Sequence, residues 1–239
     1  MSQELDHLKT AATTFGLELT ANQLGQFEAY YHLLAEWNQR MNLTRIIAWP
    51  EVVDKHFLDS LSCFALLPRL PRRVIDVGSG AGFPGLALKI AQPDIDLTLV
   101  EATGKKTEFL RHVVQALGLS PVMVLHQRAE TIGQAPAHRA RYHLAVARAV
   151  APLAVLAEYL LPLLKRQGLM LAQKGALSRA ELTAAAPAIK RLGGLPAQIT
   201  PVSIPDLAAE RTLVLVKKAA ATPKQFPRRP GLPAKQPLT

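Results

Sequence analysis

Short apolar runs alternate with amphipathic segments along most of the chain after residue 67. The apolar runs predict strands, and the segments between them, with apolar residues three and four positions apart, predict helices. Buried parallel strands read as continuous apolar runs, so this alternation indicates a mostly parallel, doubly wound α/β sheet of seven strands. The strands are predicted at 74–77, 96–101, 122–126, 143–147, 168–173, 199–203 and 212–217, with helices at 86–91, 105–117, 153–164 and 179–192. No helix is predicted between the last two strands, which therefore suit an antiparallel hairpin at the sheet edge.

The first 67 residues have a helical pattern instead. Thr20 is a suitable N-cap for a helix whose apolar residues recur at helical spacing, and a further helix is expected at about 50–67. The residues expected to face inward in the first of these helices are Leu24, Phe27, Tyr31, Leu34 and Trp37. We predict a helical cap at 1–67, a Rossmann-like domain at 68–218 and a basic, proline-rich tail at 219–239. The tail is expected to be extended and either to pack on that domain or to project from it.

A glycine-rich turn follows the first predicted strand, in the segment RVIDVGSGAGFPG at 73–85. Gly78, Gly80 and Gly82 allow a sharp turn in which a ligand lies against bare backbone. Pro84 suits the first turn of the helix that comes next. This arrangement holds nucleotide-like ligands in doubly wound folds, although a glycine pattern alone also fits an ordinary tight turn.

Two carboxylates narrow the choice of ligand for the glycine turn. Glu101 ends the second strand, about 20 residues beyond the glycines, where it can accept both ribose hydroxyls. Asp76 ends the first strand and would oppose the pyrophosphate of NAD or FAD. A ligand that carries an ammonium, a sulfonium and a ribose is favoured there, so the pattern predicts S-adenosylmethionine.

The ends of the later strands carry further candidates, because ligands in such sheets bind outside the carboxyl ends of the strands. Glu130, with Ala129, could receive the adenine amino group, or it could simply be an acid at the start of a helix. Arg148 ends the fourth strand and is expected to contact substrate or to pair with Asp76 or Glu101. Other basic residues could meet phosphates around the cofactor: Lys105, Arg128, Lys174 and Arg211.

Several chemistries are disfavoured. The histidines show no metal-ligand spacing and Cys63 is the only cysteine, so no metal site is predicted. No cysteine lies near a strand end to form a covalent adduct with a pyrimidine. The residues after strand four, Ala147 to Val150, lack the Asn/Asp-Pro-Pro-aromatic run used to methylate exocyclic amines. A ring nitrogen with a free lone pair, such as guanine N7, needs neither device and is compatible with the sequence.

Charge and composition point to a polyanionic partner. The net charge is +10, and the segment from Lys217 to Thr239 contains six basic residues and no acid. RNA is favoured over a membrane surface, because the tail lacks apolar residues that would anchor it. A solvated tail that aids solubility is the plain alternative. No apolar run approaches a membrane span and no secretory signal is visible, so a cytoplasmic protein is expected.

Several segments together resemble one family. They are NLTRI at 42–46, KHFLDSL at 55–61, DVGSGAGFPGL at 76–86, LVEATGKKTEFL at 99–110, QRAE at 127–130, ARAV at 147–150, QKG at 173–175 and the tail TPKQFPRRPGLPAKQPL. The chain is similar, from about residue 25 to its C-terminus, to the bacterial guanine-N7 methyltransferases of small-subunit (16S) ribosomal RNA. That family was formerly called glucose-inhibited division protein B.

The resemblance implies an S-adenosylmethionine-dependent enzyme of the bacterial cytoplasm, acting on one guanine of 16S rRNA or of the small subunit, and a monomer is expected. It places Gly78, Phe83, Ala129, Glu130 and Arg148 at the cofactor, and Lys105, Arg128, Arg148 and Arg211 at the RNA or its guanine. Many members carry leucine where this chain has Phe83, a conservative change. Two other hypotheses are an RNA-binding assembly factor with a structural cofactor and a nicotinamide-dependent oxidoreductase.

Overall fold

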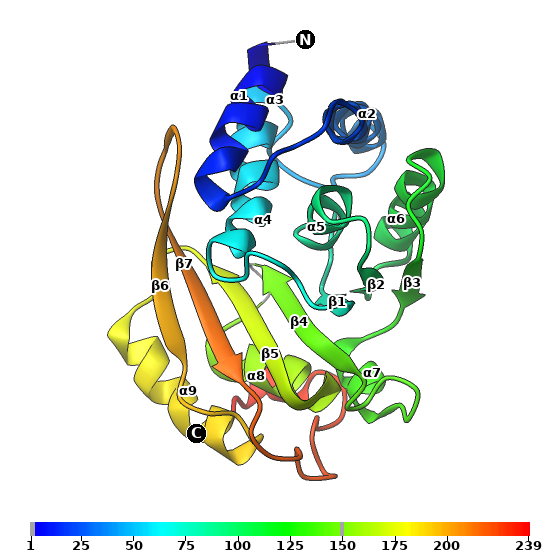
Figure 1. Cartoon of the computed structure of the whole chain (residues 1–239). Helices are drawn as coiled ribbons and strands as arrows, with labels where there is room; N and C mark the ends of the chain where they lie inside the picture. The colour runs from blue at the N-terminus through cyan, green and yellow to red at the C-terminus, as the bar shows by residue number, and fades with distance from the viewer. Residues whose placement is uncertain (1–2, 149–150) are drawn as a thin grey trace.

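The computed structural model describes residues 3–148 and 151–239. Ala149 and Val150, which complete the ARAV segment, lie outside the described residues. A seven-stranded sheet with the order β3-β2-β1-β4-β5-β7-β6 forms the centre of the molecule (Figure 1). The strands are β1 (Arg73–Val77), β2 (Asp96–Glu101), β3 (Val122–His126), β4 (Tyr142–Arg148), β5 (Leu164–Lys174), β6 (Gln198–Ile204) and β7 (Leu207–Lys217).

The sheet is parallel from β3 to β5, whereas β7 is antiparallel to both β5 and β6. The predicted fold class and the predicted edge hairpin are therefore confirmed. The hairpin is longer than expected, because β7 begins at Leu207 and its first residues pair with β6 beyond the rest of the sheet. Its tip reaches the N-terminal helix, where His7 Nδ1 lies 3.7 Å from Asp206 Oδ2.

Alternate residues of the strands face two separate apolar layers, as expected for a period of two. Val74 and Leu144 face one layer with helices α5, α6 and the cap, whereas Ile75 and Ala145 face the other layer with helices α7, α8 and α9. These helices are α5 (Gly85–Ala91), α6 (Gly104–Ala116), α7 (Ala129–Gln134), α8 (Leu153–Leu160) and α9 (Arg179–Arg191). Helix α7 was not among the predicted helices, although Glu130 was considered as an acid at the start of one; six residues are too few to show a helical period.

The N-terminal helices lie above α5 in Figure 1 and pack in the same apolar layer as α5 and α6. Thr20 caps the second helix as predicted, in a reciprocal arrangement with Gln23. Tyr30 is fully buried in that helix, whereas Tyr31 and Trp37, which were expected inside, are only partly buried. The cap consists of α1 (Gln3–Ala12), α2 (Ala21–Asn38), α3 (Trp49–Val52), a π-helical turn (Val53–Leu58) and α4 (Asp59–Leu61), with short 3₁₀ turns at Thr13–Phe15 and Ser62–Ala65. A further 3₁₀ turn, Leu161–Leu163, lies outside the cap.

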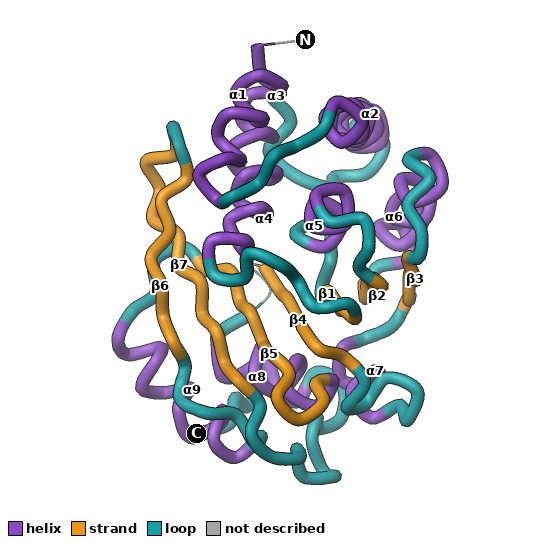
Figure 2. Tube along the Cα trace, viewed as in Figure 1, coloured by secondary structure: helices purple, strands orange, loops and turns teal. Residues whose placement is uncertain are grey.

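The basic C-terminal tail folds back over α7 and α8, so it packs on the domain, which is one of the two expected arrangements, and does not project from it. It is mostly loop, as Figure 2 shows, and ends with the short helix α10 (Leu232–Lys235). Arg139 donates hydrogen bonds to the carbonyls of Gly133 (2.8 Å) and Phe226 (2.6 Å). The Arg228 side chain and backbone bind the buried carboxylate of Glu158 at 2.7–3.1 Å.

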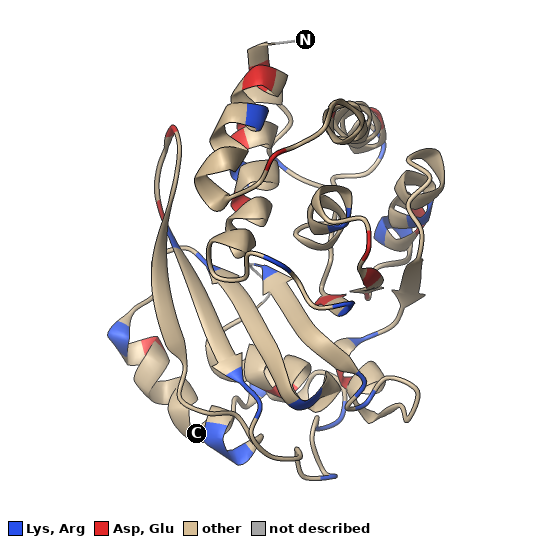
Figure 3. Ribbon diagram, in the orientation of Figure 1, with Lys and Arg blue, Asp and Glu red and all other residues tan. Residues whose placement is uncertain are grey.

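Cap and sheet share one hydrophobic cluster, and the tail packs on the same body. The division at residues 67 and 218 therefore stays a prediction. Figure 3 shows basic residues on the tail and on α9, and acidic ones on α1. Within 3–148 and 151–239, no helix is both long and apolar enough to cross a membrane.

Candidate active site

A cavity of about 770 Å³ opens at the carboxyl ends of the parallel strands. Its walls come from the loops after β1, β2, β3 and β5, from Arg148 at the end of β4, and from the cap, which closes one side. Residues from distant parts of the sequence thus meet where a doubly wound sheet binds ligands. The polar and charged residues of the lining include Thr44, Lys55, His56, Asp59, Glu101, Lys106, Arg128, Glu130, Arg148, Tyr159, Gln173, Lys174 and Arg211.

The glycine turn is held by the neighbouring strand. The backbone N–H groups of Gly78 and Ser79 both donate to the Val100 carbonyl, at 2.8 and 3.1 Å. Gly78 and Gly80 have φ of 75° and 57° and line the cavity. Gly82 (φ 98°) does not line it; a side chain there would collide with Tyr30 and Leu86. A glycine at position 82 therefore lets the loop pack closely against the cap.

Glu101 is a buried carboxylate at the end of β2. Its Oε2 accepts the N–H of Gly80 at 3.0 Å and its Oε1 accepts the N–H of Thr103 at 2.8 Å. These two bonds orient the carboxylate in the cavity wall. Because each carboxylate oxygen can accept more than one hydrogen bond, Glu101 retains capacity for two ribose hydroxyls.

Asp76 lies behind the glycine turn and is not part of the cavity lining. Its Oδ2 accepts the N–H of Gly85 at 2.9 Å, and its Oδ1 is buried without a partner. Burial raises the pKa of Asp76 to about 7, against the opposing effect of the Gly85 hydrogen bond. Asp76 supports the glycine turn through its hydrogen bond to Gly85. A direct role in cofactor binding stays a prediction.

Ala129 and Glu130 lie at the start of α7, in the segment that follows β3, and they line the cavity there. The tail reaches this place, since the backbone N–H of Gly231 donates to Glu130 Oε1 at 2.8 Å. Tyr159 of α8 lines the same region, and burial, followed by the charges of Glu130 and Glu158, raises the pKa of Tyr159 to about 12. Neither the tail contact nor Tyr159 was predicted from the sequence.

Arg148 does not pair with Asp76 or Glu101, which corrects both expected pairings. Its guanidinium donates to Asp59 Oδ2 at 2.8 Å and to the Lys55 carbonyl at 2.9 Å. It also covers the ring of Phe83, 5.0 Å from its centroid. The partners come from the cap, so cap and sheet meet at this side chain.

Asp59 joins two of the predicted arginines. Its Oδ1 accepts from Arg211 Nε at 2.9 Å, while its Oδ2 holds Arg148. The carboxylate side chain is only 7% exposed, so the two ion pairs are strong and directional. Asp59 was missed; the available signal was a carboxylate within the apolar helix 50–67.

His56 completes this side of the cavity. Its ring stacks on Phe83 with centroids 4.6 Å apart, and its Nε2 lies 2.9 Å from Thr44 Oγ1. Burial, together with the Arg148 charge, lowers the pKa of His56 to about 3, so the ring is neutral at physiological pH. His56 belongs to the π-helical turn, a local distortion that is frequent at functional sites.

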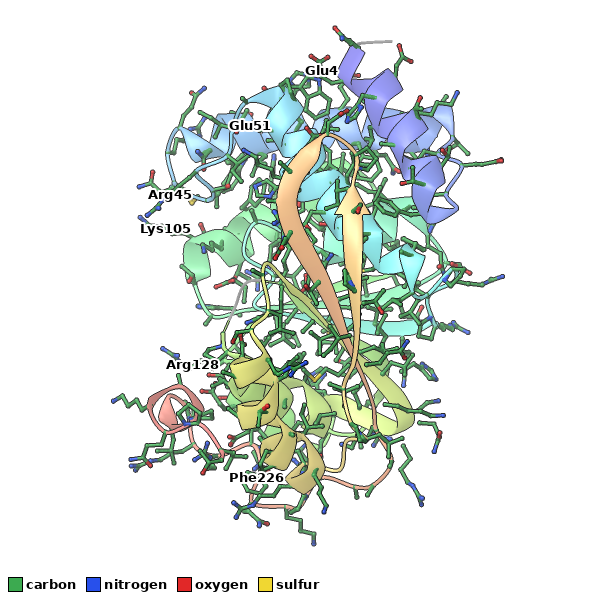
Figure 4. The ribbon with its side chains drawn as sticks, turned by 90° about the vertical axis from the view of Figure 1, so that its left-hand side faces the viewer. Glu4, Arg45, Glu51, Lys105, Arg128 and Phe226 are labelled. Carbon is green, nitrogen blue, oxygen red and sulfur yellow. The ribbon has the colours of Figure 1, made fainter. Side chains whose placement is uncertain are left out.

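Several basic residues line the cavity or lie next to a lining residue in the sequence. Figure 4 shows Arg45, Lys105 and Arg128 on one side of the molecule. Arg128 is exposed and lines the cavity, whereas Lys105 does not line it and its neighbour Lys106 does. The role of Lys105 at the RNA therefore stays a prediction.

The cavity suits S-adenosylmethionine, the cofactor that the fold implies. Bare backbone at Gly78 and Gly80, the Glu101 carboxylate, and Glu130 with Tyr159 lie in succession along β1, β2 and β3. They match the amino-acid, ribose and adenine parts of S-adenosylmethionine. Among the described residues there is no group of three or more His, Cys, Asp or Glu that could hold a metal ion.

Comparison with known proteins decides the family. A family model described as rRNA small subunit methyltransferase G matches residues 23–213. The chain belongs to this family. It is 48% identical to the ribosomal RNA small subunit methyltransferase G of Roseiflexus castenholzii, over 98% of this chain and 100% of that protein. It is 45% identical to the protein of the same name from Desulforamulus reducens, over 97% of each chain.

The fold also matches solved structures. A SAM-dependent O-methyltransferase from Thermotoga maritima aligns with a TM-score of 0.54 at 14% identity, covering 80% of this chain and 72% of that one. Such a distant match supports the fold alone. As a member of the methyltransferase G family, the chain uses S-adenosylmethionine as cofactor.

Proposed function

We propose that this protein transfers the methyl group of S-adenosylmethionine to N7 of a guanine in 16S ribosomal RNA. The observation that carries the proposal is a single cavity with two distinct halves. One half, along β1 to β3, has the acceptors for a ribose and an adenine. The other, at β4, β5 and the cap, has the Asp59, Arg148 and Arg211 cluster, whose cations suit a nucleotide.

Methyl transfer to N7 requires the protein mainly to position the two reactants. When bound, the cofactor supplies an electrophilic methyl group on a sulfonium. The N7 lone pair forms the new N–C bond while the S–C bond breaks, and no proton has to be removed. The enzyme therefore acts by positioning and electrostatics. Arg148, held by Asp59 and the Lys55 carbonyl, is preorganised for this task.

The residue roles form part of the proposal. Gly78, Gly80, Phe83, Glu101, Ala129 and Glu130 serve the cofactor, with Asp76 and Gly82 supporting its loop. Arg148 and Arg211 serve the target nucleotide, and Lys105 and Arg128 contact neighbouring phosphates. The substrate is 16S rRNA or the small subunit, the enzyme is a monomer, and the reaction takes place in the cytoplasm.

Mass-spectrometric mapping tests the proposal. The protein is incubated with methyl-labelled S-adenosylmethionine and small subunits from a strain that lacks this methyltransferase, in parallel with the naked 16S rRNA. We expect label on N7 of one guanine. Label on another atom or base contradicts the proposal, and binding without any transfer would favour the assembly-factor hypothesis.

A further inference from the structure

Gln173 lines the cavity beside Arg148, and no described residue donates a hydrogen bond to its buried Oε1. It lies at the end of β5, directly across from Arg148 in the β4–β5 pairing. The residue is 3% exposed. Among the described residues, only Gln173 Oε1 and Asp76 Oδ1 are buried side-chain polar atoms without a hydrogen-bond partner. A buried acceptor of this kind is unusual and calls for a ligand or a water.

The orientation of the Gln173 amide is set by its neighbours. Its Nε2 donates to the Asp59 backbone carbonyl at 2.5 Å and to Ser62 Oγ at 3.2 Å. A carbonyl can only accept, so the nitrogen must face it and the oxygen must face away. The same segment of the cap that holds Arg148 therefore also fixes the direction of this acceptor.

We propose that Gln173 Oε1 accepts an N–H from the Watson–Crick edge of the target guanine, which makes Gln173 a specificity-determining residue. The inference rests on the proposed function. Guanine offers N1–H and the N2 amino group on that edge, whereas adenine has a lone pair at N1. A fixed, buried acceptor therefore favours guanine, because adenine would place an acceptor against it.

The same contact strengthens during the reaction. As the methyl group moves from the sulfonium to N7, positive charge develops on the guanine ring and its N1–H becomes more acidic. The hydrogen bond to Gln173 Oε1 is then stronger in the transition state than in the bound substrate, which is the condition for a contribution to rate. Gln173 thus acts on turnover as well as on base selection.

The wild-type enzyme provides the first test. Small subunits are reconstituted with guanine, inosine or 2-aminopurine at the methylated position; inosine lacks the N2 amino group and 2-aminopurine lacks N1–H. We expect kcat/KM to fall by about tenfold or more for at least one analogue. Equal kcat/KM for all three bases would overturn the inference without any variant.

Gln173→Met provides the second test, because methionine has a similar length and no acceptor of this strength. We expect kcat/KM on guanine to fall by about tenfold or more, down to the level of the penalised analogue, with unchanged affinity for S-adenosylhomocysteine. A variant that keeps the wild-type preference for guanine, or that loses only cofactor affinity, contradicts the assignment.

Two control variants separate the loss of the acceptor from other effects of substitution. Ser62→Ala removes one hydrogen bond that holds the amide but leaves Oε1 in place, so the preference for guanine should persist. Gln115→Met changes an exposed glutamine of α6 outside the cavity and should change neither rate nor preference. If wild-type enzyme methylates none of the three substrates, the proposed function fails, whereas transfer without base-edge sensitivity defeats only the role of Gln173.

Discussion

Asp59 is the residue on which the substrate half of the cavity depends. Both of its carboxylate oxygens are used, one by Arg148 and the other by Arg211. Its backbone carbonyl also accepts from Gln173. One residue of the cap therefore orients three side chains that come from β4, β5 and β7.

Asp59→Asn is expected to lower kcat/KM by roughly 10²-fold, because small displacements of positioning groups have effects of this size. The thermal midpoint should also fall, since the amide can no longer balance two partly buried guanidinium groups. Steady-state kinetics and thermal melting measure the two effects. Asp96→Asn is the matched control: its pair with Arg72 lies at the surface, where an ion pair contributes little. Equal losses in both variants would contradict a special role for Asp59.

The raised pKa of Asp76 predicts that the stability of the folded protein depends on pH. Below a pH of about 4 its carboxyl is protonated in both the folded and the unfolded chain. Between pH 4 and about 7 the unfolded chain releases its proton while the folded protein retains it, so stability from this group declines as pH rises. The difference between a pKa of 3.8 and one of about 7 corresponds to roughly 4 kcal/mol.

Asp76→Asn cannot ionise and should therefore escape this loss. Urea unfolding of the cofactor-free protein should show the variant gaining on the wild type from about pH 4 to about pH 7, by up to about 4 kcal/mol. Asp6→Asn, at an exposed position of α1, is the comparison. A constant difference between Asp76→Asn and wild type across this range would show that the Asp76 carboxyl ionises normally.

At the scale of elements, the cap and the tail are both parts of the site. The helical run from α3 to α4 supplies His56 and Asp59, and its aromatic residues pack around Phe83. The tail contributes through Gly231, whose N–H binds Glu130 in the adenine region. A segment rich in basic residues thus touches the cofactor half of the cavity, in addition to any contact with RNA.

Arg228→Ala is expected to release the tail. Glu158 is fully buried and forms an ion pair with Arg228, so removal of the guanidinium should destabilise the fold by about 3 kcal/mol or more. Loss of the Gly231 contact should also weaken S-adenosylhomocysteine binding several-fold, measured by calorimetry. The neighbouring Arg229→Ala alters an exposed arginine and should affect neither quantity. Unchanged cofactor affinity in Arg228→Ala would separate the tail from the cofactor site.

At the scale of the whole molecule, the distribution of positive charge bears on where RNA binds. The net charge of +10 accompanies Arg45, Lys105 and Arg128 on one side of the molecule, of which Arg128 lines the cavity. Arg69, in contrast, precedes β1 and lies at the opposite end of the strands, paired with Asp94. Binding of RNA should therefore depend on the rim of the cavity rather than on the overall charge.

Arg128→Ala and Arg45→Ala should each weaken RNA binding and reduce the salt dependence. For a contact with a single-stranded phosphate, the slope of log K against log salt should become less steep by about 0.7 in each variant. Titrations at several salt concentrations measure it, with Arg69→Ala as the control of equal charge. An equal change in all three variants would mean that the charge acts nonspecifically.

Much of this protein was determined by the sequence itself. The period of two in the strands and the helical spacing between them predicted the sheet, its hairpin and the positions of nearly all its long elements. The glycines and Glu101 predicted the cofactor turn, because local backbone geometry and the order of parallel strands are read along a short stretch of chain. Thr20 was predicted as a helix cap for the same reason.

The tertiary structure decided the rest. Only folding brings Asp59 to Arg211, 152 residues away, and only the Asp59 carbonyl orients the amide of Gln173. Folding also places Asp76 behind its loop and lays the tail on Glu130. Partners of charged groups depend on burial and on contacts between distant segments, and neither has a local period in the sequence. The pattern of residues therefore determined which groups reach the carboxyl end of the sheet, while packing determined which of them meet.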